Sequence, residues 1–232
     1  MQQDVLSQVV AGRIWASERP VWFSGVRLRA RTSVIRLDDG SLLVHSPAPP
    51  SAGLMKQLAD LGAVSWLVVP NCFHHLCTPA AAAAFPAAKI LGPQSAVAKN
   101  SELRLDVDIH GPQFSEAVPE FALFPLAGVP FLDETLLYHR PTQTLFGADV
   151  VLWADENDHW SWRYAARLMG CFKRVRVPPD VKKKVADKAA ASRSLHALHA
   201  LPIKRLIVAH GEIIEEAPLE QLAAAWRLVG VG

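Results

Sequence analysis

Residues 31–47 read RTSVIRLDDGSLLVHSP, and this stretch gives the strongest indication of the fold. Residues 31–37 alternate in polarity and are rich in β-branched side chains, which is typical of a strand. Asp38-Asp39-Gly40 predicts a tight hairpin turn, after which residues 41–45 return as a second strand. An earlier apolar segment, residues 9–15, is expected to form a further strand. The N-terminal part of the chain is therefore predicted to be rich in β-structure.

Helices and short strands alternate after this hairpin. Ser51 is expected to cap a helix over residues 52–61, and Gly62 to end it. Residues 66–69 are wholly apolar and predict a strand that is buried on both faces. Thr78-Pro79 predicts the start of a helix through the alanine run, with Thr78 as its cap, and residues 89–91 predict another short strand.

The second half of the chain predicts a second set of strands, followed by helices. Strands are expected at residues 121–126, 134–139 and 144–146, with the last two in a hairpin, and at 205–209. Helices are expected at 157–170, at about 181–200 with Asp180 as cap, and at 218–229. Since no linker interrupts this order, the simplest account is one α/β domain over residues 1–232, with sheets covered by helices.

The composition is that of an ordinary globular protein. The chain has 232 residues, half of them apolar, and a net charge of +2. This small net charge gives no reason to expect nucleic acid or a membrane as a partner. Three cysteines do not suggest a disulfide framework, and we see neither a signal peptide nor an apolar run that could span a bilayer. A cytoplasmic protein is the expectation.

The loop after the apolar strand contains the densest group of metal-binding side chains. Residues 70–77 read PNCFHHLC, so that His74 and His75 are flanked by Cys72 and Cys77. Imidazole and thiolate are good ligands for zinc. The alternative is a turn that leads into the next helix, with the cysteines buried as small apolar side chains.

Three other predicted strands have a single candidate polar residue at one end. Asp149 follows the strand at 144–146, His210 follows the strand at 205–209, and Glu134 begins the strand at 134–139. Functional groups often lie beyond strand ends in α/β proteins. The alternatives are a turn cap for Asp149, an ordinary His-Gly turn for His210, and a solvated acidic pair for Asp133-Glu134.

Two further stretches have simpler interpretations. The tryptophan-rich residues 153–162 could line a pocket or an interface, although packing in the core is the commoner use of aromatic side chains. Lys182, Lys183 and Lys184 are expected to form a solvated helix face.

The order of these features resembles the metallo-β-lactamase superfamily over roughly residues 9 to 215. In that family, a hairpin, a helix and a strand lead into a Thr-His-x-His-x-Asp-His loop. A Gly-His turn, a strand ending in Gly-Asp and a strand ending in Gly-His follow. The detailed resemblance is to an uncharacterised branch with a PN-x-x-HH loop and a degenerate metal site, which Pro70-Asn71 and His74-His75 match.

The resemblance also shows where this chain departs from the family pattern. His74 falls on the second histidine of the loop, Cys72 on the first, Leu76 on the aspartate and Cys77 on the third histidine. Val129 or a neighbour replaces the histidine of the Gly-His turn, and Glu134 is the nearest replacement ligand. A full two-zinc site is therefore not expected.

Asp149 and His210 are retained from the family pattern, so the resemblance implies an αββα sandwich with a reduced, mononuclear site. His74, Asp149 and His210 would hold one metal, most simply zinc, with iron or manganese as alternatives. His75 or Glu134 would be a ligand or the proton shuttle. The implied activity is hydrolysis of an unidentified small-molecule ester, thioester, amide or phosphoester. The alternative is a non-catalytic binding or interaction protein that kept the fold and lost the metal. The sequence does not indicate an oligomeric state.

Overall fold

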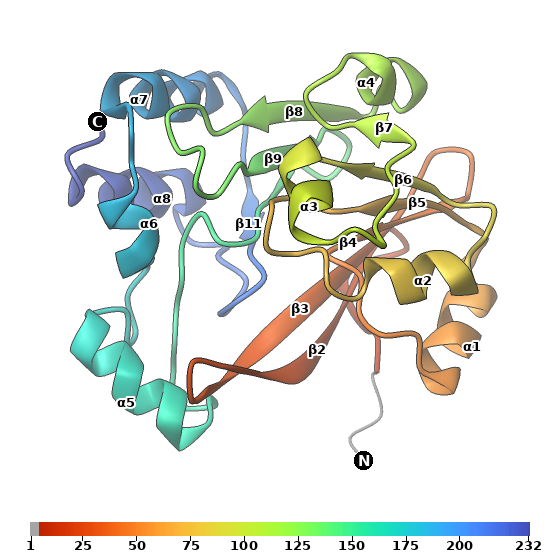
Figure 1. Cartoon of the computed structure of the whole chain (residues 1–232), viewed down its shortest axis with the longest axis horizontal. Coiled ribbons are helices and arrows are strands. Elements are labelled where there is room, and N and C mark those ends of the chain that lie inside the picture. Colours follow the sequence, from red (N-terminus) through yellow and green to blue (C-terminus); the bar gives the residue numbers. More distant parts are fainter. Residues whose placement is uncertain (1–4) are drawn as a thin grey trace. The chain divides into compact units, whose positions relative to one another are not determined.

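The structure, a computed structural model, describes residues 5–232, which form two mixed β-sheets and their helices (Figure 1). This confirms the predicted α/β class with two mixed sheets. The strands are β1 (Ser7–Val10), β2 (Ile14–Phe23), β3 (Val26–Arg36), β4 (Leu42–His45), β5 (Val64–Val68), β6 (Lys89–Gly92), β7 (Val107–Asp108), β8 (Phe121–Pro125), β9 (Thr135–His139), β10 (Thr144–Phe146) and β11 (Arg205–Ile207). The helices are α1 (Ala52–Leu61), α2 (Thr78–Ala84), α3 (Gln94–Lys99), α4 (Gln113–Ala117), α5 (Trp160–Met169), α6 (Pro179–Lys183), α7 (Lys188–Ala197), the 3₁₀-helix η1 (Leu198–Ala200) and α8 (Pro218–Arg227).

The chain divides into two compact units. The first unit comprises the residues up to Arg19 together with Arg31–Glu120, and the second comprises Pro20–Ala30 and Phe121–Gly232. Strands β2 and β3 contribute residues to both units. Each unit has its own buried core. The expectation of one domain over residues 1–232 stays a prediction.

The first unit contains the predicted hairpin and the parallel strands that follow it. Strands β3 and β4 are antiparallel around a turn at Gly40, whose φ is 83°. Strands β4, β5, β6 and β7 then run parallel, in that order. Helix α1 begins and ends as predicted, and the Ser51 hydroxyl accepts a hydrogen bond from the Leu54 backbone N–H at 3.2 Å. Leu54 and Leu58 of this helix are buried in the core of the unit.

Two predictions for the first unit were wrong. Residues 9–15 do not form one strand, because a turn in which the Arg13 N–H donates to the Val10 carbonyl separates β1 from β2. Thr78 does not cap α2: it is the first residue of that helix, Cys77 stands at the cap, and no side chain bonds the free N–H groups there.

The second unit is built on the four-stranded sheet, in the order β11-β10-β9-β8. Strands β8, β9 and β10 are antiparallel, and β10 pairs with β11 in parallel. Helices α7 and α8 bury Leu195 and Trp226 in a core with side chains of these strands (Figure 1). The hairpin predicted around Pro141-Thr142 is confirmed by the pairing of β9 with β10.

Residues 181–200 form the end of α6, then α7 and the 3₁₀-helix η1, where one helix was predicted. Helix α6 ends at Lys183, and Asp187 caps α7 by accepting from the Ala190 N–H at 2.9 Å. The Ala186 and Asp187 N–H groups both donate to the Gly128 carbonyl, at 2.8 and 3.1 Å. Because those N–H groups are bonded to another loop, a continuous helix cannot form there.

Helix α5 is shorter than predicted and begins at Trp160, with His159 as its cap. Its buried side, Trp162 and Ala166, packs against Leu28 of β3 in a small separate core of the second unit. Within residues 5–232, no helix combines the length and the apolar character that crossing a membrane requires.

Candidate functional site

The second unit brings Asp149 and His210 together. Both residues follow neighbouring parallel strands, β10 and β11, so both chain segments leave the sheet at the same edge. Backbone hydrogen bonds continue the pairing past the strands, from the Gly147 N–H to the Ile207 carbonyl at 2.9 Å and from the Ala209 N–H to the Ala148 carbonyl at 3.2 Å. The His210 Nε2 lies 3.5 Å from the Asp149 Oδ1.

The hydrogen bonding of His210 fixes which ring nitrogen bears a proton. Its Nδ1 lies 2.8 Å from the backbone carbonyl oxygen of Arg29. Since a carbonyl oxygen can only accept, Nδ1 must carry the hydrogen. The lone pair of a neutral His210 is therefore on Nε2, the atom that lies toward the Asp149 carboxylate. A lone pair and a carboxylate oxygen at this separation call for a positive charge between them, either a proton or a metal cation.

Glu134 organises the turn that carries Asp149. Its carboxylate is buried and accepts three backbone hydrogen bonds, from Ala148 at 2.7 Å, Asp149 at 2.8 Å and Val150 at 3.3 Å. A Cβ at Gly147 would lie 2.8 Å from Leu136 Cδ2 and 3.1 Å from Glu134 Oε1. Glycine is therefore required for this close approach.

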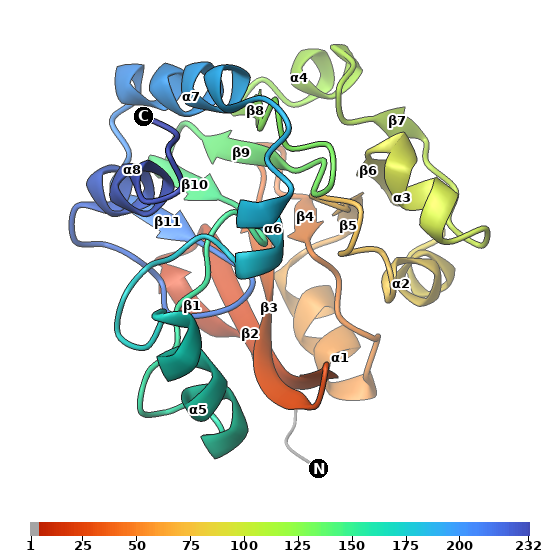
Figure 2. The same ribbon diagram turned by 60° about the vertical axis from the view of Figure 1, so that its left-hand side comes forward.

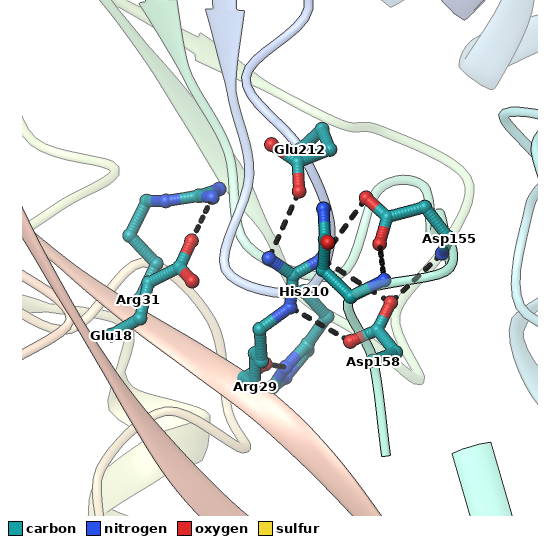
Figure 3. A network of polar contacts seen from close by, with 8 residues as sticks. Glu18, Arg29, Arg31, Asp155, Asp158, His210 and Glu212 are labelled. Atoms are coloured by element: carbon teal, nitrogen blue, oxygen red, sulfur yellow. Dashed lines mark hydrogen bonds and ion pairs between the residues drawn. The ribbon is translucent and has the colours of Figure 1, made fainter. Parts of the chain in front are cut away.

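The side chain of Arg29 is held by three acidic residues (Figure 3). It contacts Asp158 at 2.7 Å, Glu212 at 2.9 Å and Asp155 at 3.3 Å. A hydrogen bond with Asp155 and burial raise the pKa of Glu212. Burial opposes ionisation of Asp155, but the hydrogen bond from Glu212 and the charge of Arg29 bring its pKa below the usual value. The network immobilises the arginine whose carbonyl orients His210.

In the first unit, His74 lies in the loop after β5. The Asn71 Oδ1 accepts from the N–H groups of Phe73 and His74, at 2.9 and 3.0 Å, and so shapes the loop. His74 Nδ1 lies 2.5 Å from the hydroxyl of Ser46, which follows the neighbouring parallel strand β4. His74 is therefore oriented through Nδ1 by the loop of an adjacent strand.

The neighbours of His74 in this loop have different environments. His75 is buried, and burial, Lys99 and His74 lower its pKa. Leu76 is 76% exposed. The cysteine thiols accept hydrogen bonds from cationic side chains, Cys72 from Lys99 at 3.0 Å and Cys77 from Arg19 at 3.3 Å.

Sequence reasoning missed the groups that orient His74 in the first unit and His210 in the second. Ser46 is the hydrogen-bond partner of His74, but it lies 28 residues before it in the sequence. The Arg29 carbonyl, the partner of His210, leaves no signal in a sequence because any residue has a carbonyl.

Comparisons with known proteins show the fold. Residues 11–98 match the family described as domain of unknown function DUF4336. No curated protein matches. The structure is similar to a metallo-β-lactamase from Pontibacter korlensis (TM-score 0.66, 12% identity, 98% of this chain and 99% of that one). It is also similar to a metallo-β-lactamase from Erythrobacter litoralis (TM-score 0.70, 12% identity, 98% of this chain and 98% of that one). A third similar structure is the metallo-β-lactamase FIM-1 from Pseudomonas aeruginosa in a mono-zinc form (TM-score 0.68, 11% identity, 99% of this chain and 99% of that one).

Proposed function

We propose that this protein is a metal-dependent hydrolase that binds one divalent cation, most simply zinc, through His74, Asp149 and His210. The observation that carries the proposal is the pair formed by Asp149 and His210. The Nδ1–H of His210 donates a hydrogen bond to the Arg29 carbonyl, so the lone pair that could bind a metal is on Nε2, beside the Asp149 carboxylate. Metal-binding histidines commonly have their second nitrogen bonded in this way to a backbone carbonyl.

The separation of the two donor atoms fits a shared zinc ion. Zinc binds imidazole nitrogen and carboxylate oxygen at about 2.0–2.2 Å in tetrahedral geometry, which places two ligands about 3.4 Å apart. The distance between His210 Nε2 and Asp149 Oδ1 is 3.5 Å. Each side chain is less than one-fifth exposed, so bulk water screens the pair only in part.

His74 is proposed as the third ligand. Its Nδ1 is engaged with the Ser46 hydroxyl, so Nε2 is the nitrogen proposed as the metal ligand. Two imidazoles and one carboxylate make up a donor set of the kind found in catalytic zinc sites, and they also suit iron or manganese. This assignment rests on the position of His74 in the loop that resembles the metallo-β-lactamase ligand loop.

A bound zinc ion would supply a water molecule whose pKa is lowered to about 7. The residues of the chain have separate roles in the proposal. Asp149 and His210 hold the cation, and the Arg29 carbonyl keeps His210 in the tautomer that binds it. We propose that Glu134 is a positioning residue, because both its oxygens already accept backbone hydrogen bonds. His75 is the remaining candidate for proton transfer to a leaving group, and the substrate is an ester, thioester, amide or phosphoester.

Metal content tests the proposal directly. The purified protein is dialysed against zinc, iron(II) or manganese(II), and bound metal is measured by elemental analysis. About one equivalent is expected for the wild type, and a large loss for His74→Ala, Asp149→Ala and His210→Ala. His196→Ala on α7 and Asp180→Asn on α6 are matched controls, because both residues are exposed and lie outside the proposed site.

Hydrolysis is then assayed with chromogenic esters, thioesters and phosphodiesters, using the loaded protein and the Asp149→Ala variant. A folded protein that takes up none of the three metals would refute the proposal. Such a result would favour the alternative, a binding protein that kept the fold and lost the metal. The exposed Leu76, which offers no ligand atom, is the observation in favour of that alternative.

A further inference from the structure

Large apolar side chains gather on one face of the second unit. Trp22 and Phe23 stand at the tip of the β2–β3 hairpin, and Trp160, Tyr164 and Leu168 stand on α5; we call these five residues the aromatic face. They are between 62% and 74% exposed. The three helix residues are four positions apart, so they form one stripe along α5.

Contacts join the β2–β3 hairpin to helix α5; both elements are labelled in Figure 2. Ser24 and Gly25 have φ values of 47° and 81°, as a two-residue type I′ hairpin turn requires. The ring of Trp22 meets His159, the cap of α5, edge-on at 5.8 Å between centroids. The Arg27 N–H donates to the Ser161 hydroxyl at 3.1 Å. The aromatic face is therefore built from two elements that are bonded to each other.

Helix α5 carries positive charge beside the aromatic face. The acidic residues that precede this helix are paired with other side chains, Asp155 and Asp158 with Arg29, and Glu156 with Lys173. Arg163 and Arg167 lie on α5 itself, which contains no acidic residue. Arg167 is stacked on Phe172 at 3.6 Å, beside the C-terminal end of the helix.

We propose that the aromatic face docks on the surface of an anionic lipid bilayer without crossing it. Trp and Tyr favour the boundary between lipid and water, and Lys and Arg beside them are attracted to anionic headgroups. The expectation of no membrane partner rested on the small net charge of the whole chain and on the lack of a spanning segment. Neither observation concerns a site at which charge and exposed aromatic rings are concentrated locally.

The same charge argues against a second copy of the chain as the occupant. A two-fold symmetric dimer would place the face against itself, so that Arg163 and Arg167 of each copy would lie close to the same residues of the other. Like charges in such an interface are unfavourable. An anionic bilayer, in contrast, complements both the basic and the apolar residues.

Vesicle sedimentation tests the proposal. The full chain is mixed with phosphatidylcholine vesicles, with and without phosphatidylserine, and the bound fraction is measured. Binding is expected to require phosphatidylserine and to weaken as salt is added. Replacing Trp160 and Tyr164 together by serine should abolish most of the binding. Arg163→Ala should weaken binding about fivefold on the anionic vesicles.

Two matched variants serve as controls. Leu228→Ser removes an apolar side chain that is 59% exposed, and Arg193→Ala removes an exposed arginine; both lie in the same unit but outside the face. Circular dichroism and thermal melting are used to confirm that every variant is folded. Quenching of tryptophan fluorescence by brominated lipid should be strong for the wild type and weak for Trp22→Ser combined with Trp160→Ser.

Several results would overturn the proposal. Equal binding to neutral and anionic vesicles would remove the role of charge. Unchanged binding by the Trp160 and Tyr164 variant, or an equal loss in Leu228→Ser, would remove the role of the aromatic face. Tight binding of an RNA oligonucleotide that the same variants abolish, without lipid binding, would assign the face to nucleic acid.

Discussion

Replacing Glu134 by glutamine changes one buried oxygen into an amide nitrogen and leaves the size of the side chain unchanged. In the wild type, Oε1 accepts from Ala148 and Val150, while Oε2 accepts from Asp149. The amide oxygen of glutamine can replace only one of these two carboxylate oxygens as a hydrogen-bond acceptor. Its NH₂ group must then oppose a backbone N–H, so at least one donor in a buried turn loses its partner.

The expected loss of stability follows from the hydrogen bonds. A hydrogen bond to a charged group contributes about 1.5–3 kcal/mol, and a buried donor left without a partner costs a similar amount. Glu134→Gln should therefore destabilise the protein by about 2–3 kcal/mol. For a chain of this length, that corresponds to a fall in Tm of roughly 4–12 °C. The turn that carries Asp149 should also loosen, so that zinc affinity decreases with stability.

The assay compares thermal and urea unfolding of Glu134→Gln with those of Glu216→Gln, in which the replaced side chain is exposed. Zinc binding is measured for both variants at a temperature at which both are folded. If Glu134→Gln unfolds at the wild-type temperature, the three hydrogen bonds do not hold the turn. If it is destabilised but binds zinc as the wild type does, the turn does not position Asp149, and that part of the reasoning fails.

Three further predictions concern other parts of the chain. Ser51→Ala removes the cap of α1 and should cost about 1 kcal/mol in urea unfolding, with no change for the exposed Ser101→Ala if the cap is the cause. Burial lowers the pKa of His45 to about 3 from its ordinary 6.5, so the unfolded chain binds a proton that the native state excludes. This contribution to the free energy of unfolding is present above pH 6.5 and falls as the pH decreases toward 3, by up to about 5 kcal/mol. His45→Leu should therefore flatten the plot of the urea midpoint against pH between pH 7 and 4. If the slope of that plot is the same as for the wild type, His45 is not the cause. Zinc at about 100 times its Kd should stabilise the wild type by about 2.7 kcal/mol, with no effect on Asp149→Ala and the full effect retained in Asp180→Asn.

Local signals in the sequence predicted the elements that depend on local interactions. Helix α1 follows from a capping serine and from the spacing of Leu54 and Leu58, and the turn at Gly40 follows from a residue suited to positive φ. The break between α6 and α7 could not be predicted in this way. It depends on the Gly128 carbonyl, which is more than fifty residues away and accepts the N–H groups that a continuous helix would need.

The candidate site shows the same division between local and distant information. Asp149 and His210 were predicted because each follows an apolar strand, and the parallel pairing of β10 with β11 brings them together. The hydrogen bonds of Glu134 could not be predicted from the sequence, because two consecutive acidic residues, Asp133 and Glu134, suggest a pair that is exposed to solvent. Its contacts with three N–H groups exist only once β9 lies beside the turn after β10.

The candidate ligands and the residues of the 70–77 loop differ in what supports them. Asp149 has its backbone held by Glu134, and His210 has its ring held by Arg29, whose side chain is bound in turn by Asp155, Asp158 and Glu212. Leu76 is exposed, and the thiols of Cys72 and Cys77 accept hydrogen bonds from Lys99 and Arg19. The contacts of Glu134 and Arg29 thus fix the two groups whose donor atoms lie 3.5 Å apart. The proposed cation site therefore depends on these supporting contacts, and the Glu134→Gln variant tests one of them.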